Sequence, residues 1–283
     1  MKCSIVIINH NTKELTNQTI QSVLIGTKIE FEIILVDNST SDSERFYDHV
    51  DDHVKIVHCE NKGFGHACNF GVESAIGEFI LLLNSDTIVE SKSIETCIDY
   101  LELHQDVGAL GCKLVLEDGS LDHGCRRGFP TPMNSLFYFM GLDRIFPKNP
   151  LFGGYRLNYL TINETHNVDA VSGAFMMMRR ILYQQINGFD ESFFMYGEDL
   201  DLCYRIKEAG LRVVYYPHAT VIHLKGQSGL KTSSKTVIYH FYDAMLIFYR
   251  KHYRKKYGEM LYLLVLFAVK LKYQLTLMRG HHD

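Results

Sequence analysis

The chain has 283 residues, enough for one large α/β domain or two smaller ones. Hydrophobic residues make up 46% of the sequence and charged residues 22%, so a sizeable core can be buried. The formal net charge of −4 lacks the basic excess that accompanies nucleic-acid binding, and we expect no nucleic-acid partner.

The cysteines and the apolar runs bear on the cellular location of the protein. Seven cysteines are scattered without a C-x-x-C pair, which disfavours a disulfide framework or a structural zinc site and favours reduced thiols in the cytoplasm. The N-terminal apolar run, 3–8, is too short for a signal peptide. The longest uninterrupted apolar run, 260–269, falls short of the ~20 residues that span a bilayer, so we expect no transmembrane helix.

The first part of the chain alternates between two patterns. Continuous apolar runs predict buried strands at 4–8, 31–36, 54–57, 78–83 and 107–116. Helix-capping and helix-ending residues predict helices at 12–26, at 64–76, and from Ser91 to about 104, with Thr12 as the first cap. Strands that alternate with helices form parallel βαβ units, so we expect an α/β fold.

The second part of the chain is less regular. Residues 117–165 hold four of the five prolines, and we expect a loop-rich segment with short helices. The elements expected after it are a strand at 168–178, helices at 179–186 and 198–209, and short strands at 211–216 and 220–224. From residue 235 onwards the sequence predicts a helical tail that is basic and aromatic.

Three polar clusters each follow a predicted strand directly: Asn9-His10-Asn11, Asp37-Asn38-Ser39 and Asn84-Ser85-Asp86. Turn formation explains any one of them, because Asn, Asp and Ser favour turns. In an open parallel sheet, however, ligands bind beyond the carboxyl ends of the strands. Three such clusters at one edge favour a ligand site.

Two further features in this half fit a nucleotide. An acid after the second strand, here Asp37, often accepts hydrogen bonds from a ribose or a base. Gly63 and Gly65 precede a predicted helix, where backbone N–H groups can approach a phosphate. Taken alone, the glycines fit an ordinary turn between strand and helix equally well.

Asp86 and His223 are candidate metal ligands. Asp86 follows a strand that is apolar on both faces, and a carboxylate there can bind a hard divalent cation together with a diphosphate. The alternative is an acid that caps the helix near Ser91. His223 lies in a short apolar strand, where a histidine is commonly a hydrogen-bonded core residue instead.

The densest acidic cluster is Glu198-Asp199-Leu200-Asp201 at the start of a predicted helix. Carboxylates are favourable there because of the helix dipole. Asp201 has Arg205 one turn further on as an ion-pair partner, whereas Cys203 occupies that position for Asp199. We therefore expect Asp199 to be an unpaired carboxylate that can act as a general base.

Together these segments resemble family 2 glycosyltransferases of the GT-A fold, in particular the rhamnosyltransferase-like branch. The resemblance covers about residues 4–226 and rests on segments that occur in the family's order. These segments are 4–11, 36–42, 61–65 with Asn69, 83–86, 172–174, 188–190, 197–205 and His223.

The resemblance implies a role for each matching residue. Asp199 corresponds to the catalytic base, and Asp86 and His223 to the ligands of Mg²⁺ or Mn²⁺. Asn84 stands where the family's DxD motif has its first acid, which places more weight on the other two ligands. The residues that would bind the nucleotide donor are Ile8, Asn9, His10, Asp37, Asn38, Lys62, Gly63, Asn84 and Ser85.

The resemblance also implies an organisation and a reaction. Residues 1–112 would form the nucleotide-sugar-binding half, 113–234 the acceptor-binding and catalytic half, and 235–283 the tail. The reaction would be an inverting transfer, with dTDP-L-rhamnose favoured and UDP-sugars open as donors, to a polysaccharide or lipid-linked glycan. A sugar-nucleotide nucleotidyltransferase would carry a glycine-rich loop after the first strand, and 9–13 contains no glycine. A non-catalytic binding module is a third possibility.

The tail predicts contact with a membrane or with another helix. Its basic residues from Arg250 onwards are opposed only by Glu259 and Asp283, and many aromatic residues lie among them. This composition fits a helix at the headgroup level on the inner face of the cytoplasmic membrane. Packing on the catalytic domain, or a homodimer interface, fits the aromatic residues equally well.

Overall fold

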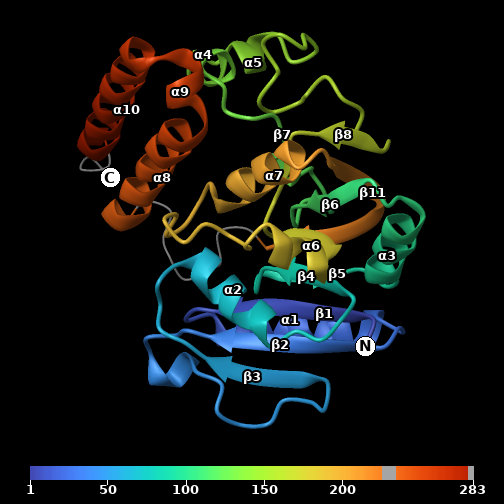
Figure 1. The fold of residues 1–283 in the computed structure, drawn as a ribbon. Coiled ribbons are helices and arrows are strands. Elements are labelled where there is room, and N and C mark those ends of the chain that lie inside the picture. Colours follow the sequence, from blue (N-terminus) through green and yellow to red (C-terminus); the bar gives the residue numbers. More distant parts are fainter. Residues whose placement is uncertain (225–233, 280–283) are drawn as a thin grey trace.

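The computed structural model describes residues 1–224 and 234–279. Its centre is a nine-stranded sheet with the path β3-β2-β1-β4-β10-β6-β11-β5, in which β8 also pairs with β11 (Figure 1). In chain order the strands are β1 (Cys3–Asn9), β2 (Phe31–Asp37), β3 (Val54–His58), β4 (Phe79–Leu83), β5 (Thr87–Val89), β6 (Val107–Val115), β8 (His166–Val168), β10 (Phe175–Arg179) and β11 (Arg212–His223). A small second sheet pairs β7 (Arg126–Arg127) with β9 (Ala170–Val171).

The N-terminal half has the predicted alternation. Strands β1 to β4 are parallel where they pair, and every residue of β1 and β4 is buried, as their continuous apolar runs require. The helices between them are α1 (Lys13–Gly26), α2 (Phe64–Glu73) and α3 (Ser93–Leu103). A Cβ at Gly71 would lie 2.6 Å from Val6, so this glycine lets α2 lie directly on the sheet.

Two predicted helix ends are wrong by a few residues. Helix α2 ends at Glu73 instead of 76. Helix α3 is capped by Lys92, which has a left-handed backbone with φ of 64°, and not by Ser91. Thr12 is the N-cap of α1 as predicted, but its hydroxyl contacts Asn9 instead of capping an N–H group. Short local signals place helix ends only approximately.

The second half differs from the prediction at two strands. The segment predicted as one strand at 168–178 is divided into β8, β9 and β10, because a turn at 172–174 interrupts it. The two strands predicted at 211–224 are one strand, β11, with an irregularity between Tyr216 and Thr220 around Pro217. Proline lacks the N–H that a sheet ladder uses, which explains the interruption.

The remaining helices agree with the expected pattern. The middle segment contains α4 (Pro132–Phe139) and α5 (Leu142–Ile145) within loops, and α6 (Arg180–Gln185) and α7 (Glu198–Glu208) follow. The tail comprises α8 (Lys235–Phe248), a π-helical turn (Tyr249–Tyr253), α9 (Arg254–Tyr257) and α10 (Glu259–Arg279). Helices α8 and α10 lie side by side at one end of the molecule (Figure 1). Asp283, counted above with the tail, lies outside the described residues.

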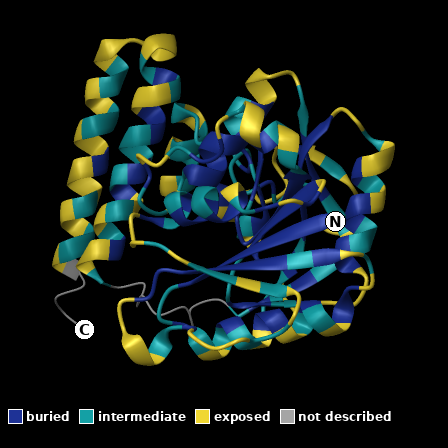
Figure 2. Ribbon diagram, turned by 60° about the horizontal axis from the view of Figure 1, so that its bottom comes forward, coloured by how far each residue is buried: buried dark blue, intermediate teal, exposed yellow. Residues whose placement is uncertain are grey.

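Helix α10 corrects the expectation about membrane-spanning length. In the described part of the chain, one helix is long and apolar enough to cross a membrane: the window Glu259–Met278 has a mean hydropathy of 1.5, and all of its residues except Val269 are exposed or half-buried. Lys270 ends the apolar run 260–269, but neither it nor Lys272 ends the helix. Figure 2 shows the exposed outer side of this helix.

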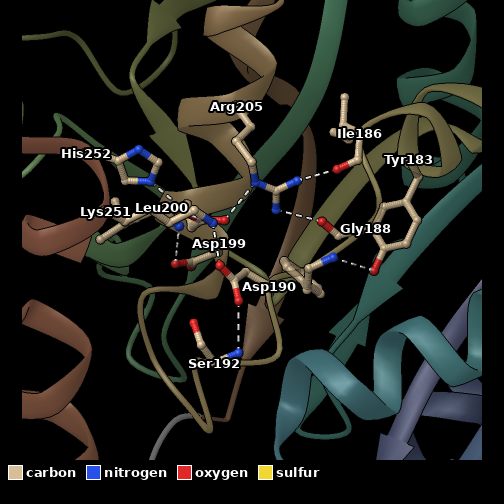
Figure 3. Close-up of polar contacts among 12 residues, drawn as sticks. Tyr183, Ile186, Gly188, Asp190, Ser192, Asp199, Leu200, Arg205, Lys251 and His252 are labelled. Carbon is tan, nitrogen blue, oxygen red and sulfur yellow. Dashed lines mark hydrogen bonds and ion pairs between the residues drawn. The ribbon is translucent and has the colours of Figure 1, made fainter. Parts of the chain in front are cut away.

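A buried ion-pair cluster fastens the tail to α7. The carboxylate of Asp201 is fully buried and accepts hydrogen bonds from Arg205 at 2.8 Å and His252 at 2.7 Å, and it lies 2.7 Å from the ammonium of Lys251 (Figure 3). The Asp201–Arg205 pair is the one expected from their spacing. Since Lys251 and His252 belong to the π-helical turn of the tail, the start of α7 and this turn are held together.

Candidate active site

The loops after β1 and β2 meet through the pairing of Asn9 with Asp37 at the ends of the two strands. The amide of Asn9 is buried and donates to the hydroxyl of Ser39 at 2.8 Å. The carboxylate of Asp37 is also buried and accepts the N–H groups of Ser39 and Phe46 at 2.9 and 2.6 Å. The side chains of Asn9 and Asp37 therefore stabilise the loops after β1 and β2, where other residues predicted to bind the nucleotide lie.

Three further residues predicted to bind a nucleotide lie around this loop. Ile8 is buried at the end of β1. The imidazole Nδ1 of His10 is half-buried and lies 3.1 Å from the side-chain oxygen of Asn38. The structure thus brings the residues of the first two clusters together, and among Ile8, Asn9, His10, Asp37 and Asn38 only His10 is not buried.

The glycine loop has a structural explanation. Gly63 has a φ of +110°, and a Cβ there would lie 2.4 Å from the carbonyl oxygen of Phe194. The N–H of Phe64 donates to the same carbonyl at 2.9 Å. The neighbouring Lys62 is exposed and pairs with Glu60 at 3.1 Å. The close contact between the loop at Gly63 and the loop at Phe194 therefore requires a glycine, whether or not Lys62 binds a ligand.

The third cluster lies at the end of β4. The N–H of Asn84 donates to the carbonyl of Ala174 at 3.1 Å, and the hydroxyl of Ser85 lies 3.2 Å from that of Thr12. Asp86 follows and is buried. The cluster therefore faces both the first loop and the strand β10.

Asp86 and His223 lie together, as predicted. Their Oδ1 and Nε2 atoms are 3.3 Å apart, and the N–H of Leu224 donates to the carbonyl of Asp86 at 2.8 Å. The other ring nitrogen, Nδ1, lies 2.8 Å from the carboxylate of Asp122. Burial lowers the pKa of His223, but the hydrogen bonds and charges of Asp122 and Asp86 outweigh burial and raise it to about 9.

Asp199 is not an unpaired carboxylate, and this expectation is wrong. Arg127 donates a hydrogen bond to its Oδ2 atom, and the N–H of Gly173 donates to the same atom at 3.2 Å. Spacing along one helix could not reveal these partners, because they come from β7 and from the turn after β9. Asp199 is nevertheless positioned by fixed donors, as a general base must be.

The neighbouring Glu198 is an unusual buried acid. Its Oε2 atom has no hydrogen-bond partner among the described residues, and the side chain is buried. Burial in the first place, and then the charge of Asp199, raise the pKa of Glu198 to about 8. One of the two adjacent acids is thus neutral near pH 7.

A cavity of about 220 Å³ lies where α7 meets the tail and α4. Arg127, Glu198 and Asp199 line its polar part. Its other walls are apolar or aromatic and include Tyr138, Phe139, Phe241, Phe248, Val265 and Val269. The carboxylate of Asp199 therefore borders an apolar space that is formed partly by α10. The sequence pattern did not predict this cavity.

Most of the chain is similar in sequence to a known protein family and to individual members of it. Residues 2–238 match the model of a family described as glycosyltransferase like family 2. The chain is 31% identical over 198 residues to rhamnosyltransferase WbbL of Escherichia coli (strain K12), which covers 67% of this chain and 71% of that protein. It is 27% identical over 242 residues to an N-acetylglucosaminyl-diphospho-decaprenol L-rhamnosyltransferase of Mycobacterium tuberculosis, which covers 79% of this chain and 76% of that one.

Solved structures of low sequence identity share the fold. Mannosyltransferase PcManGT from Pyrobaculum calidifontis, in complex with GDP-Man and Mn²⁺, has a TM-score of 0.59 at 14% identity and covers 99% of this chain and 73% of that one. Some similar chains are longer, and this chain spans 64% of S. aureus TarS 1-349. The α/β fold with a C-terminal helical tail is as predicted. The chain belongs to glycosyltransferase family 2 and has the GT-A fold.

Proposed function

We propose that this glycosyltransferase moves a sugar, with inversion, from a nucleotide donor to a hydroxyl of a cell-surface polysaccharide or lipid-linked glycan. The observation that carries the proposal is the position of Asp199, held by Arg127 at the polar end of a cavity. The names of the relatives support the chemistry: two are rhamnosyltransferases, and one of them names a diphospho-decaprenol acceptor. L-rhamnose from dTDP-rhamnose is therefore the sugar that we propose.

The donor site in this proposal is the edge formed by the loops after β1, β2 and β4. Residues 1–112 form the nucleotide-sugar-binding half, 113–234 the acceptor-binding half, and 235–283 the tail. Buried Asn9 and Asp37 shape the edge, whereas His10 and Lys62 are accessible enough to contact a ligand. Asn38, Gly63, Asn84 and Ser85 complete the candidate set around it.

A divalent cation fits the residues at Asp86 and His223. A carboxylate oxygen and an imidazole nitrogen face each other at 3.3 Å, and both suit Mn²⁺ or Mg²⁺. In the described part of the chain no group of three or more His, Cys, Asp or Glu side chains is arranged to hold a metal ion. We therefore propose that diphosphate oxygens complete the shell. A bound cation there neutralises charge on the departing diphosphate.

The chain's own residues then perform the transfer in one displacement. Asp199 accepts the proton of the acceptor hydroxyl, and the oxygen attacks the anomeric carbon from the face opposite the nucleotide. The bond from this carbon to the diphosphate oxygen breaks, and the nucleoside diphosphate leaves with the bonding electron pair. Arg127 and the N–H of Gly173 keep the carboxylate oriented during this step. A single displacement inverts the configuration of the sugar.

The acceptor site in this proposal is the cavity at Asp199, and its apolar walls suit an acceptor with a lipid part. Helix α10 forms one wall through Val265 and Val269, and its outer side exposes Leu264 and Phe267. We propose that this outer side lies on the inner face of the cytoplasmic membrane. Such contact brings a lipid-linked hydroxyl to the cavity.

The test is a panel of nucleotide sugars, containing dTDP-L-rhamnose, UDP-sugars and GDP-mannose, incubated with Mn²⁺ or Mg²⁺ and the full chain. We expect slow, cation-dependent hydrolysis of one donor without acceptor, fastest for dTDP-L-rhamnose. Faster hydrolysis of another donor would replace the sugar in the proposal. Failure of every donor to bind or be hydrolysed would contradict the proposed function.

A further inference from the structure

We propose that Asp122 is a positioning residue for the cation site, because it holds the imidazole of His223 with its Nε2 atom turned toward Asp86. Asp122 lies in the loop-rich segment 117–165, which contains no recognisable sequence motif. The inference rests on the proposed function, since it concerns the cation that Asp86 and His223 would hold.

The two ring nitrogens of His223 face different carboxylates. Nδ1 lies 2.8 Å from Oδ2 of Asp122, a good hydrogen-bond distance, whereas Nε2 lies 3.3 Å from Oδ1 of Asp86. All three side chains are at least nine-tenths buried. Binding of a cation displaces the second ring proton, because only the neutral imidazole is a ligand. Nδ1–H then donates to Asp122, and the lone pair of Nε2 is available on the side of Asp86. A carboxylate behind a ligating histidine fixes the tautomer and the ring orientation.

Asp122 is itself held firmly. Its backbone N–H donates to the carbonyl of Leu114 at 2.9 Å, and its Oδ1 atom accepts the N–H of Gly124 at 2.9 Å. Val115 and Leu121 form an isolated antiparallel bridge that closes the turn before it. The position of the carboxylate therefore does not depend on His223, as a positioning residue requires.

The backbone of His223 is placed by other contacts. Strand pairing sets His223 opposite Thr87, and the N–H of Leu224 donates to the carbonyl of Asp86 at 2.8 Å. These contacts remain when the side chain of Asp122 is removed. What Asp122 adds is the orientation and tautomer of the ring, so its loss should affect cation binding more than folding.

The test uses the full chain with Asp122→Ala and Asp122→Asn. The matched control is Asp118→Asn, an exposed acid of the same segment that accepts hydrogen bonds from the N–H and the hydroxyl of Ser120. Binding of Mn²⁺ is measured by electron paramagnetic resonance of the free ion in the presence of dTDP, whose diphosphate oxygens would complete the shell, with correction for the Mn²⁺ that dTDP binds without protein. The tautomer of His223 is read from ¹⁵N-histidine NMR spectra at about pH 10, where the ring is neutral because its pKa is about 9, with His223→Gln to assign the signal. Circular dichroism reports the fold.

We expect Asp122→Ala to weaken Mn²⁺ binding by about 10- to 100-fold and to shift the His223 tautomer, with a native circular dichroism spectrum. Asp122→Asn, which keeps an acceptor oxygen, should lose less, and Asp118→Asn should match the wild type. If Asp122→Ala fails to fold, Asp122→Asn provides the same test of Mn²⁺ binding and of the His223 tautomer. If the Asp122 variants bind Mn²⁺ within twofold of the wild type and keep the same His223 tautomer, the role of Asp122 is overturned, but the cation site is not. A wild-type chain that binds no Mn²⁺ would overturn the cation site as well, while donor hydrolysis would still report the transferase.

Discussion

Arg127 forms an ion pair with the carboxylate of Asp199, although 72 positions separate the two residues in the chain. The pairing of β7 with β9 sets Arg127 opposite Ala170 and so brings it to the start of α7. Arg127 also donates to the carbonyl of Val171 at 3.3 Å, which fixes its direction. The candidate base is thus oriented by a residue from another part of the fold.

Arg127→Met should therefore impair transfer by misplacing Asp199. We expect kcat to fall by about 100-fold, the scale for a small misplacement of a reacting group. Nucleotide affinity should be unchanged, because the donor loops lie on other strands. Arg127→Lys keeps the charge but not the planar fork, and should recover only part of the rate. Steady-state kinetics together with nucleotide titration separate these effects, and a normal kcat in Arg127→Met would rule out the positioning role.

Glu198→Gln should stabilise the fold at high pH. The pKa of Glu198 is about 8 in the fold because of burial and the charge of Asp199, and about 4.3 in an unfolded chain. Between these values the folded state holds the extra proton, so stability falls as the pH rises, by up to about 1.4 kcal/mol per pH unit.

Glutamine stays neutral, so the variant should lose this slope. We expect melting temperatures that resemble the wild type near pH 4.5 and exceed it by pH 8, measured by thermal denaturation in a buffer series. A parallel pH dependence of the two proteins would show that Glu198 is ionised in the fold.

Lys251→Met should loosen the tail from α7. Lys251 lies 2.7 Å from the buried carboxylate of Asp201 and also pairs with Asp190, whereas methionine keeps most of the apolar stem. We expect a loss of roughly 1–2 kcal/mol in the free energy of unfolding at pH 7. Lys270→Met, at an exposed position of α10, is the matched control and should cost little.

The effect of Lys251→Met should also depend on pH. Burial opposes ionisation of Asp190, but Lys251 and Ser192 outweigh it and lower the pKa to about 2, against about 3.9 unfolded. This contribution is present above about pH 3.9 and is lost as the pH falls toward 2. Chemical denaturation at pH 7 and pH 3 should therefore show a smaller difference from the wild type at pH 3.

The outer side of α10 should bind anionic membranes. Leu264 and Phe267 are 61% and 68% exposed, and basic residues lie on the same tail. Leu264→Glu with Phe267→Glu, and a chain ending at Tyr257, should lose flotation with anionic liposomes at low salt. Leu103→Glu, at an exposed leucine of α3, is the control. If the wild type stays soluble and the double variant dissociates a dimer in light scattering, the tail is a dimer interface instead.

Sequence reasoning found the elements whose signals are local. Strands β1 and β4 are continuous apolar runs because they are buried on both faces, and Asp86 and Asp199 stand at the ends of such regular elements. Asp122 and Arg127 could not be found in this way, because strand pairing brings them to partners 101 and 72 positions away. Likewise, the close approach of Phe194 that explains Gly63 exists only in the folded chain.

Asp199→Asn tests most directly whether Asp199 is the base of a nucleotide-dependent transfer. Donor affinity is measured by calorimetric titration with the donor found in the nucleotide-sugar panel and Mn²⁺, and transfer is measured on the same protein preparations. The amide keeps the size of the carboxylate but cannot accept the proton. We expect donor affinity within a few-fold of wild type and a rate of transfer lowered by at least about 100-fold, the low end for general-base catalysis. Transfer at the wild-type rate, or loss of donor binding together with the fold, would contradict the assignment of Asp199 as the base.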